Sequence, residues 1–146
     1  MDESRYFEEF SELPIIAYRI SRKLAQGKNI DEQRFVSGMQ FHAMFILHKK
    51  GKLNMTELAG YLIMTRQQLT KLVDSLVEKG LVERGADPKN RRYVMIELSE
   101  NGRAFMEEMV DHQFRAASRF FSSLSEEDAK RFTDALTVIK EIFSKF

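Results

Sequence analysis

The chain has 146 residues, a formal net charge of +1 and a hydrophobic fraction of 43%, so a packed core is expected and an intrinsically disordered chain is excluded. It contains no cysteine, which excludes disulfides, thiolate metal sites and cysteine-based peroxide sensing and fits the reducing cytoplasm, where we expect the protein to act. No apolar run approaches the roughly 20 residues that a membrane-spanning helix needs.

Helices should dominate the chain, because helix breakers are few: two prolines and seven glycines. Apolar residues at three- and four-residue steps predict a first helix over residues 4–26, and Pro14 should kink it or divide it near Leu13. A second helix is expected over residues 34–49, where Gly51 follows as an end signal.

Two capping boxes mark the next two helices. Asn54 with Glu57 predicts the start of a short third helix, and Thr65 with Gln68 predicts the start of a fourth. Gly80 then provides the expected stop for the fourth helix. The apolar residues of that helix recur at positions i, i+3, i+4 and i+7: Leu69, Leu72, Val73 and Leu76.

Beyond Gly80 the hydrophobic period changes from 3.6 to 2, which predicts two antiparallel strands. A short strand is expected over residues 81–84 and a longer one over residues 93–98, with a polar turn over residues 85–92 between them.

Serines should cap the two last helices: Ser99 a long helix over residues 100–123, and Ser125 a final helix that reaches the C-terminus. Helix, tight turn, helix and charged hairpin in this order predict a winged helix-turn-helix, in a mainly α-helical chain with a small antiparallel β-hairpin wing. The second helix of such a unit packs on the first through its apolar face, which leaves its outer face free to enter a DNA major groove.

Positive charge is concentrated in the same region. Residues 49–92 carry ten Lys/Arg and five Asp/Glu, a net charge of +5, whereas the two flanks carry 13 Lys/Arg and 17 Asp/Glu, a net charge of −4. The outer face of the fourth helix should present Thr65, Arg66, Gln67, Gln68, Thr70, Lys71 and Ser75. The tip of the hairpin should present Lys89, Asn90, Arg91 and Arg92. A solvated helix face would account for the first group alone, but the two groups together favour DNA binding.

Residues 54–102 resemble the reading head of the MarR family of bacterial and archaeal transcription regulators. The most specific part is an Asp-Pro-x-x-Arg-Arg wing that is followed by a β-strand and Leu-Ser-x-x-Gly. Length and helix number also suit the family, so the resemblance covers essentially the whole chain. The matching stretches are MTELA (55–59), TRQQLTKLVDSLVEKGLV (65–82), DPKNRR (87–92) and VMIELSENG (94–102).

The resemblance implies a homodimer on a pseudopalindromic DNA site, with wing arginines, Arg92 above all, in the minor groove. It divides the chain into an N-terminal dimerisation helix (1–33), a winged helix-turn-helix region (34–98) and C-terminal dimerisation helices (99–146). Alternatively, the apolar side chains of the terminal helices only cover their own subunit. The expected interface residues are Tyr6, Phe7, Phe10, Leu13, Ile16, Ile20, Phe132, Leu136, Ile139, Phe143 and Phe146.

The resemblance also implies a regulator, most commonly a repressor, whose DNA affinity is modulated by a small aromatic or lipophilic effector. Such a compound would bind in a cavity between the dimer helices and the reading head. Candidate residues for this cavity are Tyr18, Arg19, Phe41 and Phe45.

Two positions depart from the pattern of the family. Asn90 stands where the family often has Asp, whose carboxylate can hold the wing arginine, Arg92, by a charge-assisted hydrogen bond. We therefore expect a more mobile wing. Ile63 stands where the turn of the helix-turn-helix often carries a small residue or glycine.

Other functions find little support in the sequence. It has no Gly-rich phosphate loop, no Gly-x-Ser-x-Gly and no paired-histidine motif, so neither an enzyme nor a cofactor is expected. A metal-responsive regulator would have to use His42, His48 or His112, but lone histidines on helices are more often ordinary polar residues, and no metal site is expected. The rival from another class is a winged helix that serves as a protein-interaction module without sequence-specific DNA binding.

Overall fold

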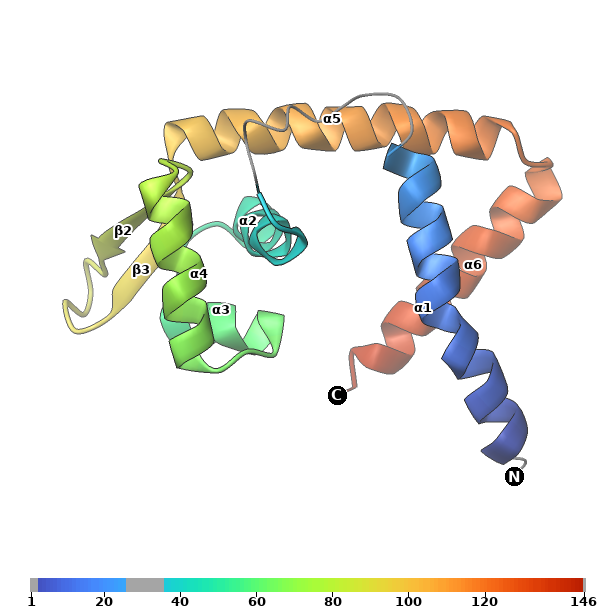
Figure 1. Ribbon diagram of the computed structural model, residues 1–146, viewed down its shortest axis with the longest axis horizontal. Helices are drawn as coiled ribbons and strands as arrows, with labels where there is room; N and C mark the ends of the chain where they lie inside the picture. The colour runs from blue at the N-terminus through green and yellow to red at the C-terminus, as the bar shows by residue number, and fades with distance from the viewer. Residues whose placement is uncertain (1–2, 26–35, 146) are drawn as a thin grey trace. The chain divides into compact units, whose positions relative to one another are not determined.

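The computed structural model describes residues 3–25 and 36–145, apart from the side chains of Ser21, Leu24 and Ala25. Within these ranges the chain is mainly helical with one small sheet, as predicted (Figure 1). In chain order the elements are α1 (Glu3–Ala25), α2 (Gly38–Lys50), β1 (Leu53–Asn54), α3 (Met55–Leu62), α4 (Arg66–Glu78), β2 (Val82–Ala86), β3 (Val94–Leu98), α5 (Glu100–Ser122) and α6 (Glu126–Phe143).

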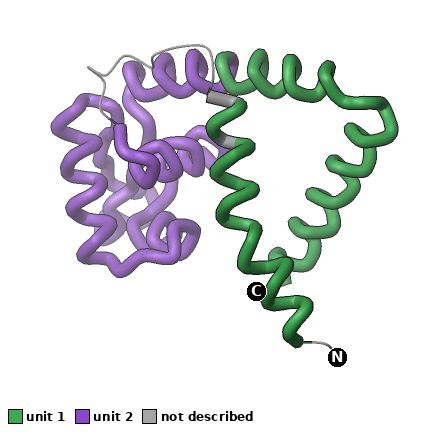
Figure 2. The backbone as a smooth tube through the Cα atoms, turned by 45° about the vertical axis from the view of Figure 1, so that its right-hand side comes forward, with its two compact units in different colours: residues 1–28, 112–146 green, residues 29–111 purple. Residues whose placement is uncertain are grey.

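The chain forms two compact units (Figure 2). Unit 1 consists of residues 1–28 and 112–146, and unit 2 consists of residues 29–111. The division falls inside α5, so the first turns of this helix belong to unit 2 and the later turns to unit 1.

The capping boxes of α3 and α4 form as predicted. Asn54 Oδ1 accepts a hydrogen bond from the backbone N–H of Glu57 at 2.9 Å, and Thr65 Oγ1 accepts from that of Gln68 at 3.2 Å. Ser125 caps α6 in the same way, at 3.0 Å from the N–H of the third helical residue. These local bonds satisfy N–H groups that a helix start leaves without partners.

Helix α2 begins later than predicted. The Ser37 hydroxyl accepts from the N–H of Gln40 at 3.2 Å, and Gln40 Oε1 accepts from the N–H of Ser37 at 3.0 Å. This third capping box fixes the first helical residue at Gly38, so the predicted start at residue 34 is wrong; residue 34 itself lies outside the described residues.

Helix α1 runs through Pro14 without a break, so of the two expected effects of this proline the division near Leu13 is wrong, and the kink stays a prediction. Proline removes one backbone donor and leaves the carbonyl of the residue four positions earlier without its helical partner. All side chains from Glu3 to Arg19 are exposed, so water can reach this carbonyl and satisfy it.

The sheet has three strands in the order β1-β3-β2, all antiparallel, and not only the predicted two-stranded hairpin. The additional strand, β1, has two residues, too few to show a period of 2 in the sequence. Strand β2 begins at Val82 and not at Leu81, because the N–H of Leu81 still donates to the carbonyl of Leu76 at 3.0 Å and completes the end of α4.

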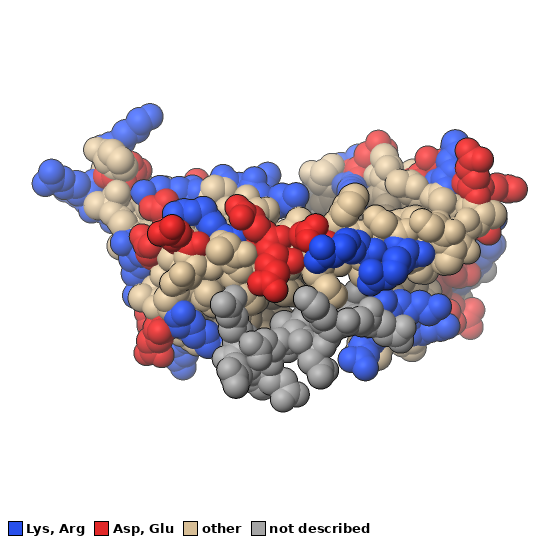
Figure 3. All heavy atoms as spheres, turned by 90° about the horizontal axis from the view of Figure 1, so that it is seen from above, with Lys and Arg blue, Asp and Glu red and all other residues tan. Residues whose placement is uncertain are grey.

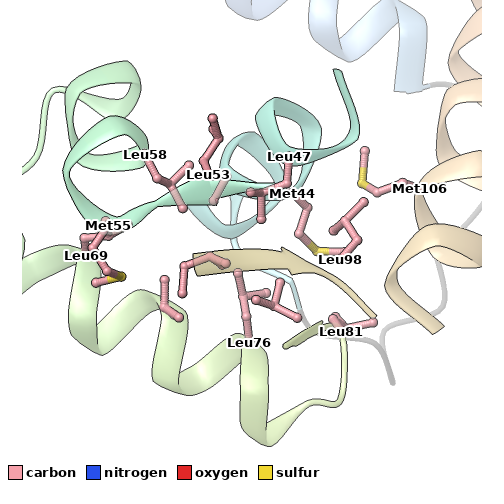
Figure 4. Packing of buried hydrophobic residues seen from close by; sticks show 14 of the residues in the cluster. Met44, Leu47, Leu53, Met55, Leu58, Leu69, Leu76, Leu81, Leu98 and Met106 are labelled. Carbon is pink, nitrogen blue, oxygen red and sulfur yellow. The ribbon is translucent and has the colours of Figure 1, made fainter. Parts of the chain in front are cut away.

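The hydrophobic core of unit 2 lies between the sheet, helices α2, α3 and α4, and the first turns of α5 (Figure 4). Leu69 and Leu76 of α4 are fully buried in it, so the core fixes which side of α4 faces solvent. The largest fully buried side chains are Met44, Leu58, Leu69, Leu76, Ile96 and Met106.

Unit 1 contains α1, the later turns of α5, and α6. Phe120 and Phe121 of α5 make edge-to-face contacts with Phe132 of α6, with ring centroids 6.2 and 5.5 Å apart. These aromatic contacts hold the corner between the two helices. Among the described helices, none combines the length and the apolar character needed to cross a membrane.

Candidate nucleic-acid interface

The outer face of α4 and the tip of the wing lie on one side of unit 2. Figure 1 shows the N-terminal end of α4 and the β2–β3 loop at the lower side of this unit, with α5 on the opposite side. Because Leu69, Val73 and Leu76 are fully buried on the inner face of α4, the remaining face points to solvent beside the wing. This is the arrangement by which a winged helix-turn-helix engages a duplex.

Three side chains on the outer face of α4 are available for DNA. Arg66, Gln67 and Lys71 are exposed, and within the described residues no side chain forms a hydrogen bond or ion pair with them. Arginine and lysine can donate to guanine O6 and N7 or to phosphates, and glutamine can pair with adenine. Of the residues predicted for the outer face of α4, these three have side-chain polar groups that form no hydrogen bond or ion pair within the described residues.

Three other predicted residues shape the first turns of α4. Gln68 Oε1 accepts from the backbone N–H of Thr65 at 3.0 Å, which completes the capping box. The Thr70 hydroxyl donates to the carbonyl of Arg66 at 2.8 Å. All three are exposed, and Gln68 keeps its side-chain NH₂ group as a donor for a base edge or a phosphate.

Ser75 lies one helical turn after Lys71 but is less exposed than the other predicted residues of α4. Its side chain is half-buried and accepts a hydrogen bond from Gln40 Nε2 of α2 at 2.9 Å. Lys79 Nζ donates to Oε1 of the same glutamine at 2.8 Å. Gln40, which the sequence analysis did not single out, therefore joins the start of α2 to the end of α4. The Ser-x-x-Gln spacing from Ser37 was the signal for its capping role.

The wing tip is a hydrogen-bonded turn that leaves its cations exposed. The Asp87 carboxylate accepts from the N–H of Lys89 at 2.8 Å, and Asn90 Oδ1 accepts from the N–H of Arg92 at 3.2 Å. Lys89, Arg91 and Arg92 are exposed and have no carboxylate partner among the described residues. In Figure 3 the left-hand end of the molecule, where the β2–β3 loop lies, ends in blue side chains. The tip therefore offers positive charge to a polyanion.

Ion pairs hold the wing on the rest of unit 2. The Arg84 guanidinium of β2 pairs with the Asp74 carboxylate of α4 at 2.5 Å. Lys52 pairs with Glu97 of β3 at 3.0 Å. The first pair connects the wing directly to α4, but both side chains are partly exposed, so its contribution to stability is modest.

The end of α4 is joined to the start of α5 at very short range. The N–H of Ser99 donates to the carbonyl of Leu81 at 3.1 Å, and its hydroxyl donates to the carbonyl of Gly80 at 2.6 Å. The same hydroxyl accepts from the N–H of Gly102 at 3.0 Å. A Cβ atom on Gly102 would lie 1.9 Å from the Leu81 carbonyl oxygen, so only glycine fits. This contact explains the Leu-Ser-x-x-Gly motif physically.

Asn90→Asp is expected to order the wing, because a carboxylate at this position can accept a charge-assisted hydrogen bond from the Arg92 guanidinium. Backbone ¹⁵N order parameters for residues 89–92 should rise in the variant toward the value of about 0.85 that is typical of rigid backbone. The control is Asn101→Asp, which adds the same charge at an exposed site in α5. A wild-type wing that is already as rigid as β3 would contradict the expectation.

The predicted interface residues of the terminal helices are mostly exposed in the single chain. Phe7 is 74% exposed and Phe143 62% exposed. Ile20 is half-buried, and Phe132 is half-buried against Phe120 and Phe121 of its own unit. Phe146 lies outside the described residues. The other exposed members of the set are Tyr6, Phe10, Leu13, Ile16, Leu136 and Ile139.

The four candidate cavity residues belong to different units, Tyr18 and Arg19 to unit 1 and Phe41 and Phe45 to unit 2. The two phenylalanine rings stack with centroids 6.2 Å apart, and Lys49 Nζ lies 5.5 Å from the centroid of Phe45. A cavity that combines the four stays a prediction. No group of three or more potential metal ligands occurs among the His, Asp and Glu residues that the structure describes.

The chain is similar to known transcriptional regulators. A family model described as MarR family matches residues 36–94. The HTH-type transcriptional repressor YetL of Bacillus subtilis is 28% identical over 143 residues, covering 92% of this chain and 83% of that protein. A MarR family protein from Bacillus stearothermophilus has 26% identity and a TM-score of 0.77, with 99% of both chains covered.

A third similarity concerns the fold. Streptococcus pneumoniae FabT, whose structure was solved in complex with DNA, is 19% identical with a TM-score of 0.76, again over 99% of both chains. The relatives are regulators of transcription and not enzymes, and their winged helices match the six helices and three-stranded sheet described above. The chain is therefore similar to MarR-family transcriptional regulators, through the family model over residues 36–94 and through relatives that cover most of its length.

Proposed function

We propose that the chain is a homodimeric repressor that binds a pseudopalindromic operator in the cytoplasm and whose DNA affinity is modulated by a small effector. One observation carries the DNA-binding part. Arg66, Gln67 and Lys71 are exposed side chains in the first turns of α4 without a hydrogen-bond or ion-pair partner among the described residues, and Figure 1 places that end of α4 on the same side of unit 2 as the β2–β3 loop.

The first turns of α4 enter the major groove. Gln67 is suited to adenine, and Arg66 and Lys71 are suited to guanine or to phosphates. Arg91 and Arg92 at the wing tip reach into the flanking minor groove, whose negative potential favours arginine. In a dimer the two copies of α4 occupy successive major grooves about 34 Å apart.

The relatives support the finer parts of this proposal. FabT was solved in complex with DNA, which supports a duplex as the partner of this fold. YetL is named a repressor, which supports the direction of control. The exposed apolar side chains of α1 and α6 support a second copy as their partner, because monomers rarely leave such a surface uncovered.

The effector would control the fraction of operator DNA that is occupied by the protein. A compound that binds one arrangement of the two reading heads better than the other shifts the population on or off DNA by its differential affinity. We keep Tyr18, Arg19, Phe41 and Phe45 as the candidate residues for this compound. An aromatic or lipophilic ligand suits the three rings, and the arginine suits an anionic group.

Lys71→Ala and Arg92→Ala are each expected to lower the affinity for a selected operator roughly 10- to 100-fold at physiological salt. The operator is first obtained by selection of bound sites from random DNA, and binding is measured by mobility shift over a series of salt concentrations. For the wild type, log K should fall linearly with log salt, and each variant should show a shallower slope.

Lys140→Ala is the control, because it removes one exposed cation from α6 in unit 1. Its affinity and salt slope should equal those of the wild type. If no sequence is selected and binding is insensitive to salt, the chain is a protein-interaction module instead. A loss of specific binding on addition of a metal chelator would indicate the metal-responsive alternative.

A further inference from the structure

Ile63, in the turn between α3 and α4, adopts a conformation that its side chain disfavours. Its φ and ψ are 51° and 50°, in the left-handed helical region, and it is the one non-glycine residue with positive φ in the described chain. A β-branched side chain in this region crowds the backbone and costs stability.

The chain uses the same backbone motif a second time with glycine. At the end of α3, the N–H of Ile63 donates to the carbonyl of Gly60 at 3.2 Å, and the N–H of Met64 donates to that of Ala59 at 3.0 Å. At the end of α4, Gly80 takes the place of Ile63: it has a φ of 67° and donates to the carbonyl of Val77 at 2.9 Å. Both are Schellman motifs, in which glycine is the preferred residue.

Packing does not compensate for the strained backbone. The Ile63 side chain is 95% exposed, the largest exposed fraction among the large hydrophobic residues described. Burial within the chain therefore contributes almost nothing to its stability. At the equivalent position after α4 the chain has a glycine, Gly80, which adopts a positive φ without strain. Backbone strain that the fold itself does not repay is typical of positions that serve a function.

The position of Ile63 indicates what this function is. It lies two residues before Thr65, the N-cap of α4. The α3–α4 connection lies at the lower side of unit 2 in Figure 1, together with the first turn of α4 and the wing loop. In the major groove the C5-methyl group of thymine is the apolar feature that a protein can recognise.

We propose that Ile63 is a specificity-determining residue that contacts the C5-methyl group of a thymine next to the bases read by the first turn of α4. This inference rests on the proposed function, because it requires a selected operator. It predicts that the protein discriminates thymine from uracil, which differ only in this methyl group, at one position of each half-site.

The test replaces each thymine of the selected operator by uracil, one position at a time. The wild type should lose about 3- to 5-fold in affinity at one position per half-site, the effect of one buried methyl group. Ile63→Gly should bind the thymine operator with about the same loss and should no longer distinguish thymine from uracil at that position.

Ile63→Gly is expected to fold at least as stably as the wild type, because glycine relieves the strain at this turn. Ile63→Asn is the second variant, since asparagine tolerates the left-handed region and carries no methyl group. Val77→Ala, at a partly exposed apolar site near the other end of α4, is the control and should keep the sensitivity to uracil.

The inference is overturned if the wild type binds every uracil-substituted operator as tightly as the thymine operator, while specific binding itself persists. It is also overturned if Ile63→Gly keeps the sensitivity of the wild type at the same position. Failure of the proposed function is distinct: it would appear as the absence of any selected sequence, and it would overturn both.

Discussion

Gly102→Ala is expected to lower the free energy of unfolding by about 3 kcal/mol, because the added methyl group has no room. It would lie 1.9 Å from the carbonyl oxygen of Leu81 and 2.9 Å from the carbonyl carbon. The obstacle is backbone, and it is held on both sides: the carbonyl accepts from the N–H of Ser99, and the N–H of Leu81 donates to the carbonyl of Leu76. The clash therefore has to displace the end of α4 or the start of α5.

Urea unfolding at one fixed protein concentration measures this effect, since the stability of a dimer depends on concentration. Gly60→Ala is the matched control, because it is the same substitution within helix α3 with no atom within 4 Å of the new Cβ. It should leave stability unchanged or raise it by up to about 1 kcal/mol. Equal unfolding midpoints for Gly102→Ala and wild type would show that the junction can move without cost.

The double variant Phe10→Glu, Phe143→Glu is expected to be monomeric and to lose DNA affinity at least about 100-fold. Phe10 is 61% exposed and Phe143 62% exposed in the single chain, and in the proposed dimer both are covered by apolar surface. A carboxylate at either site would have to be buried without a partner, which is strongly unfavourable. A monomer then contacts one half-site and loses the additional affinity that a dimer obtains by binding two half-sites at once.

Sedimentation equilibrium gives the molecular mass, and a mobility shift gives the affinity for the selected operator. The control, Ser11→Glu, places one glutamate at an exposed polar position of α1, next to Phe10 in the chain, and should stay dimeric. A double variant that remains dimeric would refute the assignment of these helices to the interface. A monomer with unchanged affinity would show that one reading head is sufficient for binding.

Features that depend on neighbouring residues could be predicted from the sequence. The capping boxes at Asn54 and Thr65 and the caps of α5 and α6 are formed by side chains within three residues of the backbone they satisfy. The change of hydrophobic period from 3.6 to 2 after Gly80 predicted the wing in the right region, because it too is a pattern of neighbouring residues. Each of these signals is local, so it can be recognised without knowledge of the tertiary contacts.

The features that could not be predicted from the sequence depend on contacts with residues far away in the chain. Ser75 shares the polar character of the outer face of α4, and no pattern in the sequence indicated that its hydroxyl is bound by Gln40, 35 residues away. Strand β1 exists because Leu53 and Asn54 lie beside Ile96 and Met95, and not because of any pattern of its own. In the candidate site the residue types could therefore be predicted from the sequence. Which of these side chains form hydrogen bonds inside the protein could be seen only in the fold.

Helix α4 is hydrogen-bonded to other elements mainly near its C-terminal end, so a small tilt there moves its N-terminal end by a larger distance. Within the described chain, the side-chain hydrogen bonds that join it to other elements come from its later turns and its C-cap: Ser75 and the C-cap Lys79 with Gln40, and Asp74 with Arg84. Its first turns are held by apolar packing around Leu69 and not, among the described residues, by side-chain hydrogen bonds to other elements. A helix of 13 residues is about 20 Å long, so a tilt of about 5° at the fastened end displaces the other end by about 1.7 Å. Such a displacement exceeds the tolerance of a base-edge hydrogen bond, so a slight strain near Gln40 could release an operator at the far end of the helix.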